Sequence, residues 1–195
     1  MNSLRLDLQA IVDLVPPHSR VLDLGCGDGT LLAELVRHRQ VEARGVEISE
    51  SNVRGAIGRG LPVRHGNIEE GLADYRSDAF DYVILSQTLA YLNKPAPVVS
   101  EMLRVGRHAV ISFENAGYWR ARWRALRGAG MGTTLVSGEP RVRAVTLKQF
   151  RQFAAAANAN VEQAFFLSGR RPIRWLPGLR ANVAVYVLKR KQESQ

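Results

Sequence analysis

Three glycines at alternate positions follow a short apolar segment near the N-terminus, and these residues are the best placed to do chemistry. The segment Val21-Leu22-Asp23-Leu24 leads directly into Gly25-Cys26-Gly27-Asp28-Gly29, and a helical pattern begins at Thr30. Glycine permits a tight turn and lets a ligand approach the backbone closely. A strand, a glycine turn and a helix start form the usual ligand site of an open α/β sheet. The pattern therefore predicts a small-molecule site at residues 23–29.

Carboxylates around the turn indicate which ligand it suits. Glu47 lies 20 residues after Gly27, and its carboxylate can accept hydrogen bonds from both hydroxyls of a ribose. A dinucleotide site expects Gly or Ala at the sixth position from Gly25, where this chain has Thr30. Asp23 and Asp28 would oppose a pyrophosphate, but they suit a ligand that carries an ammonium and a sulfonium. S-adenosylmethionine (SAM) is such a ligand, and the pattern favours it over a dinucleotide.

The same residues also have purely structural interpretations. The three glycines could serve only to make a tight turn. Asp28 could be a helix N-terminal charge that the helix dipole favours. Cys26 is better explained as a small buried filler than as a nucleophile, because nothing basic lies beside it in the sequence.

Apolar periodicity predicts the elements that must position this site. Strands are expected at residues 20–24, 42–48, 61–65, 80–85, 107–113, 161–167 and 182–188. Helices are expected at residues 4–15, 30–39, 50–58, 96–103 and 146–157. This alternation implies βαβ units and a mainly parallel sheet, whereas the last two strands lack a helix between them, so the last one should run antiparallel. We expect an α/β, Rossmann-like, seven-stranded sheet with helices on both faces, in a single domain over residues 1–195.

Charge is distributed unevenly along the 195 residues, of which 46% are hydrophobic. The chain carries 27 Lys and Arg against 18 Asp and Glu, a net charge of +9. Residues 1–116 sum to −3 and residues 117–195 to +12. Such a basic region attracts nucleic acid, an anionic substrate or an acidic protein surface. A single cysteine and the absence of a long apolar run predict a soluble, cytoplasmic protein without a membrane span; we expect no metal site.

The segment Asp23–Gly29 resembles the glycine motif of the class I SAM-dependent methyltransferase superfamily. This resemblance implies that SAM or S-adenosylhomocysteine is bound, with the backbone of residues 25–27 under the methionine end. The cofactor-binding residues that it implies are Asp23, Gly25, Cys26, Gly27, Glu47, Ile48, Asn67, Ile68 and Ser86. Glu47 would hold the ribose, and Ile48 would lie against the adenine. Asn67 stands where the superfamily usually has an acidic residue for the adenine amino group, and it could instead be an ordinary turn residue.

Longer stretches resemble one family of that superfamily. Residues 19–29, 45–49, 79–89 and 101–107 are similar to the MetW family of methionine-biosynthesis proteins, and the resemblance extends over roughly residues 4–127. It implies an accessory protein that binds SAM, associates with homoserine O-acyltransferase and supports the activity of that enzyme. The alternative is an active methyltransferase that acts on a small molecule or, less readily, on RNA.

Methyl transfer would place requirements on the acceptor side of the site. The sulfonium and the acceptor must lie in line, and a neutral hydroxyl or amine acceptor needs a base. Glu114 and Tyr118 follow the fifth strand and are the only weak catalytic candidates there; both could equally be surface residues. The MetW pattern has Pro and His at these two positions. The sequence therefore contains no convincing catalytic base.

A basic, aromatic stretch follows the fifth strand. Helical spacing places Trp119, Trp123 and Leu126 on one face and Arg120 and Arg124 on another. Either the tryptophans pack inward beneath solvated arginines, or Trp119, Arg120, Trp123 and Arg124 dock a protein partner; RNA and membrane surfaces are further alternatives. Residues 117–145 are predicted to be a lid or a partner-docking segment. Within them, residues 136–141 replace a longer aromatic segment of the MetW family.

Overall fold

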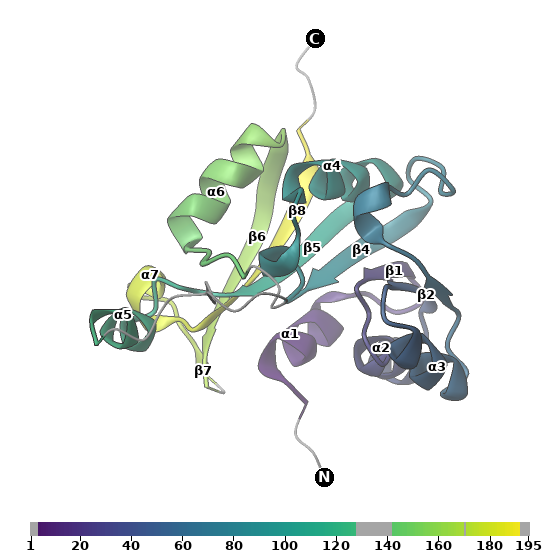
Figure 1. The fold of residues 1–195 in the computed structure, drawn as a ribbon, viewed down its shortest axis with the longest axis horizontal. Coiled ribbons are helices and arrows are strands. Elements are labelled where there is room, and N and C mark those ends of the chain that lie inside the picture. The colour runs from purple at the N-terminus through teal and green to yellow at the C-terminus, as the bar shows by residue number, and fades with distance from the viewer. Residues whose placement is uncertain (1–3, 128–141, 170, 192–195) are drawn as a thin grey trace.

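One sheet with the strand order β3-β2-β1-β4-β5-β8-β6-β7 organises the molecule (Figure 1). The computed structural model describes residues 4–127, 142–169 and 171–191. The strands are β1 Arg20–Leu24, β2 Glu42–Glu47, β3 Val63–His65, β4 Phe80–Ser86, β5 Gly106–Glu114, β6 Ala159–Ser168, β7 Arg171–Pro172 and β8 Val183–Arg190. The helices are α1 Leu6–Leu14, α2 Thr30–Arg39, α3 Glu50–Gly58, α4 Pro95–Val105, α5 Trp119–Leu126, α6 Leu147–Ala156 and α7 Pro177–Arg180. Short 3-10 turns, η1 Ile68–Glu70 and η2 Leu89–Tyr91, precede and follow β4.

Strand directions agree with the prediction from the sequence. The first five strands pair in parallel, and β8 runs antiparallel between β5 and β6. All seven predicted strands are present, and the two-residue β7 is an addition at the edge of the sheet. Because β1 has β2 on one side and β4 on the other, the strand order reverses at β1. The crevice at the carboxyl ends of strands around such a reversal is where α/β sheets bind ligands.

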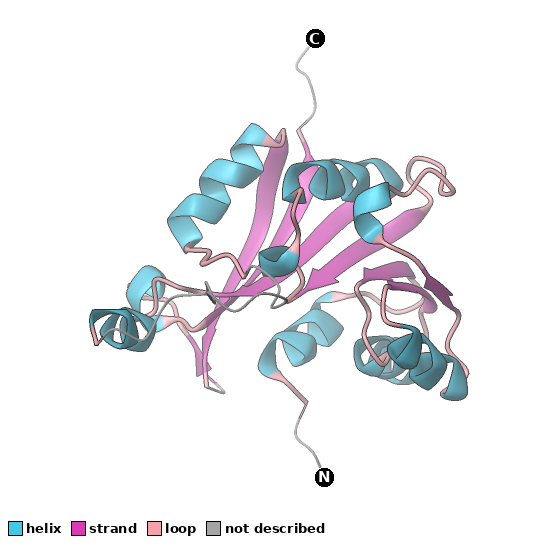
Figure 2. Ribbon diagram, viewed as in Figure 1, coloured by secondary structure: helices cyan, strands magenta, loops and turns pink. Residues whose placement is uncertain are grey.

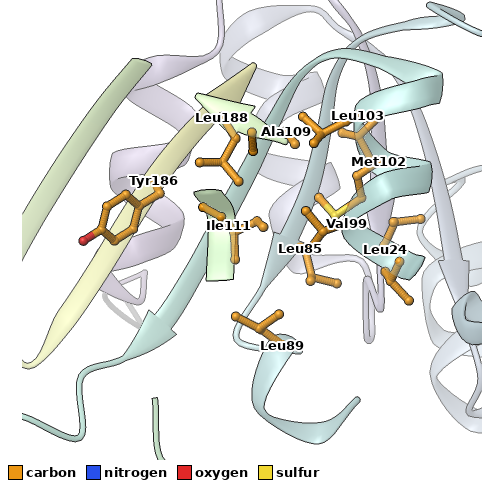
Figure 3. Close-up of a cluster of buried hydrophobic side chains, with 14 of the residues drawn as sticks. Leu24, Leu85, Leu89, Val99, Met102, Leu103, Ala109, Ile111, Tyr186 and Leu188 are labelled. Atoms are coloured by element: carbon orange, nitrogen blue, oxygen red, sulfur yellow. The ribbon is translucent and has the colours of Figure 1, made fainter. Parts of the chain in front are cut away.

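Helices cover both faces of the sheet (Figure 2). Helices α1 and α2 pack on one face, where Ile11 and Leu32 meet Val21, Ile84 and Val110. Helices α4 and α6 pack on the other face, where Figure 3 shows Val99, Met102 and Leu103 of α4 against side chains of β1, β4, β5 and β8. Successive residues of a strand point to opposite faces, so β1, β2, β4, β5 and β8 each contribute to both clusters. Two apolar layers therefore hold the carboxyl edge of the sheet in place.

Two predictions concern the rest of the chain. Within the described residues, no helix is long and apolar enough to cross a membrane. The predicted lid or docking segment 117–145 is described only in part: residues 117–127 contain α5, and residues 128–141, which include the replaced segment 136–141, lie outside the described residues.

Candidate functional site

The glycine turn after β1 depends on glycine for both its conformation and its contacts. Gly25, Gly27 and Gly29 have φ values of 71°, 58° and 79°, in the left-handed region that L side chains rarely adopt. A Cβ atom on Gly25 would lie 2.8 Å from the Thr88 hydroxyl oxygen. The turn is therefore pressed against the end of β4, at the edge where a ligand would enter.

Amide groups of this turn are satisfied within the protein. The N–H groups of Gly25 and Cys26 donate to the Val46 carbonyl oxygen at 2.8 and 3.2 Å, and the N–H of Gly27 donates to Glu47 Oε2 at 2.8 Å. A phosphate-binding loop needs free N–H groups that point at the anion. This turn instead presents acceptor oxygens, and these suit a cationic ligand.

Glu47, at the end of β2, is buried, and both of its carboxylate oxygens accept backbone hydrogen bonds, one of them from the glycine turn. Besides the bond from Gly27, its Oε1 accepts a hydrogen bond from the Ser49 N–H at 2.8 Å. Each carboxylate oxygen has two lone-pair sites. One site on each oxygen is therefore left for a second donor, as two adjacent ribose hydroxyls would require.

Asp23 is the clearest sign of a ligand. It is 2% exposed, and among the described residues its Oδ1 has no hydrogen-bond partner. Burial, together with the nearby charge of Glu47, raises the pKa of Asp23 to about 7. Buried polar atoms in proteins are nearly always hydrogen-bonded, so this oxygen fits a donor that arrives with the ligand.

Asp7 is a site residue that the sequence analysis missed. It lies in the first turn of α1 and is 1% exposed. Its Oδ2 accepts hydrogen bonds from Ser112 Oγ at 2.8 Å, Ser86 Oγ at 3.1 Å and Gln87 Nε2 at 3.2 Å. Arg5 donates to both carboxylate oxygens, at 2.8 and 3.0 Å. The start of α1 is thereby tied to the carboxyl ends of β4 and β5.

The protonation state of Asp7 follows from these contacts. Burial by itself would raise its pKa, but the hydrogen bonds and charge of Arg5, with the bonds from Ser112 and Gln87, outweigh burial and lower the pKa below its ordinary value of 3.8. Asp7 is therefore an ionised carboxylate at neutral pH. The signal in the sequence is its spacing: Asp7 stands four residues before Ile11 and eight before Val15, both fully buried, and so occupies the apolar stripe of its helix.

The buried charges of this site are mostly negative. Asp7, Asp23 and Glu47 are each less than 10% exposed, and Arg5 is the cation that contacts Asp7 and lowers the pKa of Asp23. Grouped carboxylates make the local electrostatic potential negative, and this attracts cations. Asp28 does not add to this group, because its carboxylate bonds Thr30 in the first turn of α2 and pairs with Arg59. The helix N-terminal interpretation of Asp28 is confirmed.

Cys26 contributes backbone and volume rather than a reactive thiol. It is 8% exposed, and burial raises the pKa of its thiol to about 12, with the charges of Asp23 and Glu47 adding to the effect. A Cβ atom on Gly45 would lie 2.7 Å from the Cys26 sulfur. The thiol therefore fills the space over a glycine of β2, as the filler interpretation predicts.

The residues predicted to contact adenine lie beyond β2 and β3. Ile48 is 65% exposed and offers an open apolar surface. Asn67 caps η1, since its Oδ1 accepts a hydrogen bond from the Glu69 N–H at 3.0 Å. Asn67 therefore stabilises a turn, and its contact with adenine stays a prediction. The side chain of Ile68 belongs to the core on the α4 face, which leaves its backbone for a ligand.

The acceptor side holds Ser86, Glu114 and Tyr118. Ser86 belongs to the Asp7 network and also accepts a hydrogen bond from Arg5 Nη2 at 2.9 Å. Glu114 ends β5, on the same face as Ser112 because side chains alternate, and it is exposed. Tyr118 precedes α5, and its ring centroid lies 6.0 Å from that of Trp119. Arg5 and Asp7 thus lie over Ser86 and Ser112, whereas Glu114 is the last residue of β5 and Tyr118 follows it.

The interpretation that the tryptophans of α5 pack inward is wrong. No residue of this helix is buried, and Trp119 and Trp123 are 42% and 54% exposed. The helix follows β5 past the edge of the two apolar layers, and none of its side chains belongs to either layer of the described residues. Its aromatic face is therefore a surface feature.

Comparisons with known proteins find one family that matches most of the chain. A family model described as "Methionine biosynthesis protein MetW" matches residues 5–188. The bifunctional methionine biosynthesis protein MetXA/MetW of Rhodopirellula baltica is 41% identical over 128 residues, which are 62% of this chain and 20% of that protein. The chain thus spans about a fifth of the length of this curated relative.

Solved structures of methyltransferases share the fold. The CcbJ methyltransferase of Streptomyces caelestis superposes with a TM-score of 0.74 at 16% identity, covering 96% of this chain and 91% of that one. Magnesium protoporphyrin IX methyltransferase of Synechocystis PCC 6803, solved with bound S-adenosylhomocysteine, superposes with a TM-score of 0.70 at 16% identity, covering 94% of this chain and 82% of that one. At such identities the likeness establishes the Rossmann-like methyltransferase fold.

Proposed function

The chain belongs to the MetW family of methionine biosynthesis proteins, and on that premise we propose that it is a SAM-binding accessory protein that associates with homoserine O-acyltransferase and supports its activity. The association is proposed to involve Trp119, Arg120, Trp123 and Arg124. Because SAM is made from methionine, a SAM site on such a partner would make the activity of the acyltransferase respond to the level of this end product.

One observation carries the SAM half of this proposal: the unpartnered carboxylate oxygen of Asp23 in a buried, negatively charged turn. The ammonium of SAM supplies the donor that this oxygen lacks, and its net positive charge offsets the excess of carboxylates. Glu47 has the lone pairs to take the ribose hydroxyls, and the backbone of Gly25, Cys26 and Gly27 lies under the methionine end. Ile48, Asn67, Ile68 and Ser86 complete the proposed site.

The partner half of the proposal is supported by the printed name of the Rhodopirellula baltica relative, which joins MetXA and MetW in one bifunctional protein. Fusion places two units at a high effective concentration, which favours units that act on each other. We take the MetXA unit to be the homoserine O-acyltransferase. In the present chain the two units would meet as separate proteins.

Accessory function fits the acceptor side better than methyl transfer does. The carboxyl ends of β4 and β5, where an acceptor would approach, are covered by Arg5 and Asp7. Neither side chain serves as a base, because one is a guanidinium bound to a carboxylate and the other is an ionised carboxylate whose pKa is lowered. A methyl acceptor would have to displace this network.

An active methyltransferase is the second candidate, favoured by the methyltransferase fold itself. It predicts conversion of SAM to S-adenosylhomocysteine when the protein is incubated with a cell extract. Glu114→Ala and Tyr118→Phe would then lower the rate of conversion. The absence of turnover in the wild-type protein would eliminate this candidate.

The experiment that tests the main proposal measures the rate of homoserine O-acyltransferase from the same cell, with and without this protein, across SAM concentrations. We expect the rate to depend on the protein and to change with SAM. Glu47→Ala should abolish the response to SAM and keep the response to the protein. A rate that is the same at every ratio of the two proteins would overturn the accessory role, and a rate unaffected by SAM would overturn the sensor role.

A further inference from the structure

We propose that α5 and α7 form one preorganised docking surface for an acidic face of a protein partner. We call it the Trp–Arg surface and define it by Trp119, Arg120, Trp123, Arg124, Arg127, Trp175 and Arg180. This proposal rests on the proposed function for the identity of the partner. It extends the expected docking residues to a second element, α7, which is more than 50 residues further along the chain.

Exposed apolar side chains are concentrated on this surface. The chain has three tryptophans, Trp119, Trp123 and Trp175, and they are 42%, 54% and 69% exposed. Leu126 and Leu179 of the same two helices are 82% and 40% exposed. Contiguous exposed apolar side chains mark interaction sites on soluble proteins. Tryptophan and arginine are also the residues most enriched where interface binding energy is concentrated.

Each tryptophan is paired with an arginine. The guanidinium carbons of Arg120, Arg127 and Arg180 lie 5.1, 5.4 and 5.9 Å from the ring centroids of Trp119, Trp123 and Trp175. Such cation–π contacts hold long side chains in place before a partner arrives. Less side-chain entropy is then lost on binding, and this raises the affinity that the contacts yield.

Asn115 fixes the loop that leads into α5 to α7. It is 3% exposed, and its Nδ2 donates to the carbonyl oxygens of Gly178 and Ala181 at 3.1 and 2.8 Å. Its Oδ1 accepts a hydrogen bond from the Gly117 N–H at 2.9 Å. A Cβ atom on Gly117 would lie 2.9 Å from the Gly178 carbonyl oxygen, so a glycine is needed for this close approach. The start of α5 is thereby held beside α7, and Figure 1 shows the two helices together at one end of the molecule.

Charge determines the kind of partner. Residues 117–127 and 171–182 contain no Asp or Glu and seven arginines, namely Arg120, Arg122, Arg124, Arg127, Arg171, Arg174 and Arg180. A protein face with several carboxylates around an apolar centre complements this surface. Nucleic acid fits less well, because single-stranded bases stack on aromatic ring faces, and here a guanidinium lies over a face of each tryptophan ring.

Strand β5 connects the Trp–Arg surface to the Asp7 network. The strand carries Ser112 of that network and ends at Glu114, and α5 begins five residues later at Trp119. Occupancy of the SAM site is proposed to reach the bound enzyme along this segment.

The test measures the dissociation constant of the full-length protein for homoserine O-acyltransferase from the same cell. Three variants are compared with the wild type: Trp123→Ala on α5, Trp175→Ala just before α7 and the charge reversal Arg124→Glu. Arg54→Glu, an exposed arginine of α3, is the matched control for charge reversal. Circular dichroism verifies that each variant is folded. We expect each surface variant to weaken binding by about tenfold or more, and the control to stay within about twofold of the wild type.

The outcomes separate this proposal from the proposed function. If the wild type binds and Trp123→Ala and Trp175→Ala bind equally well, the Trp–Arg surface is wrong and the accessory role stands. If the wild type neither binds nor alters the acyltransferase, the accessory role fails and the assignment of this partner fails with it. The wild type and the three surface variants are also tested for binding to a single-stranded RNA oligonucleotide and to phosphatidylserine vesicles. If the variants lose binding to one of these ligands but still bind the acyltransferase, the surface belongs to that ligand and the protein-partner assignment is overturned.

Discussion

The hydroxyl of Ser112 at the end of β5 donates a hydrogen bond of 2.8 Å to the carboxylate of Asp7, which lies 105 residues earlier in α1. This contact joins the first helix to the carboxyl edge of the sheet. Ser86 and Gln87 at the end of β4 bond the same carboxylate oxygen. The start of α1 therefore lies across the carboxyl ends of β4 and β5.

Asp7→Asn is expected to lower the free energy of unfolding by about 1–3 kcal/mol, because a charged acceptor that serves several buried donors is replaced by an amide. Chemical denaturation measures the change. Asp13→Asn on the same helix is the control, since that side chain is 65% exposed, and it should change stability by less than about 0.5 kcal/mol. Equal stabilities for the two variants would contradict the importance of the network.

The Asp7 contribution also predicts a dependence on pH. The folded-state pKa of Asp7 lies below the ordinary value of 3.8, so its stabilisation is present above that value and is lost as the pH falls through the folded-state pKa. The difference in unfolding free energy between the wild type and Asp7→Asn should therefore be constant near neutral pH and shrink below about pH 4. A difference that persists undiminished into strong acid would assign the effect to packing.

Asp23 predicts the opposite trend. Its pKa rises from 3.8 when unfolded to about 7 in the folded protein, so between these values the folded state binds more protons than the unfolded state. The free energy of unfolding should therefore fall as the pH rises from about 4 to 7. Asp23→Asn cannot titrate, and it should show less of this decline. Urea denaturation of both proteins from pH 4 to 8 provides the measurement, and parallel curves would exclude the effect.

SAM binding should depend on the same carboxyl group. A cationic ligand requires ionised Asp23, so the affinity of the wild type should increase from pH 6 to pH 8, by up to about tenfold per pH unit below the pKa. Calorimetric titration at pH 6, 7 and 8 tests this expectation. Asp23→Asn should bind SAM more weakly, and any pH dependence that it retains comes from the ligand or from other groups. A wild-type affinity that is constant over this range would contradict a direct role.

Glu47→Gln is expected to weaken SAM binding by about 10-fold to 100-fold, because charge-assisted hydrogen bonds to the ribose and to the turn become neutral ones or are lost. Glutamine has nearly the same shape, but it keeps only one of the two acceptor oxygens that bond the Gly27 and Ser49 N–H groups. Glu50→Gln at the start of α3, where the side chain is 69% exposed, should leave the affinity unchanged. Equal affinities for both variants and the wild type would place the ribose elsewhere.

Comparing Gly25→Ala with Gly27→Ala separates the cost of a positive φ from the cost of a steric clash. Both residues have a positive φ, which costs about 1–2 kcal/mol for an L side chain. A Cβ atom on Gly25 would also lie 2.8 Å from Thr88 Oγ1, whereas on Gly27 it would meet nothing within 4 Å. We expect Gly25→Ala to be the more destabilising of the two in chemical denaturation. A larger loss for Gly27→Ala would show that the turn is held differently.

The sequence by itself determined the features that depend on local chain geometry. Strands and helices followed from apolar periodicity, because a residue spacing of 2 or 3.6 decides which side chains share a face. The glycine turn was identifiable because Gly25, Gly27 and Gly29 adopt backbone angles that other residues rarely reach. Glu47 followed from its distance to that turn, since a crossover helix returns the chain to the neighbouring strand.

Only the tertiary structure decided which side chains meet across long separations. Asp7 is held in the site by hydrogen bonds to residues 79 to 105 positions away. The local sequence pattern indicates only that a carboxylate stands in the apolar stripe of its helix. The tryptophans of α5 lie on the surface because β5 ends beyond the edge of the two apolar layers, and the sequence does not reveal where that end lies. Asn115 likewise joins the loop before α5 to α7 through carbonyl groups more than 60 residues away. Burial and hydrogen bonding are properties of the neighbours that folding assembles, and those neighbours are distant in the sequence.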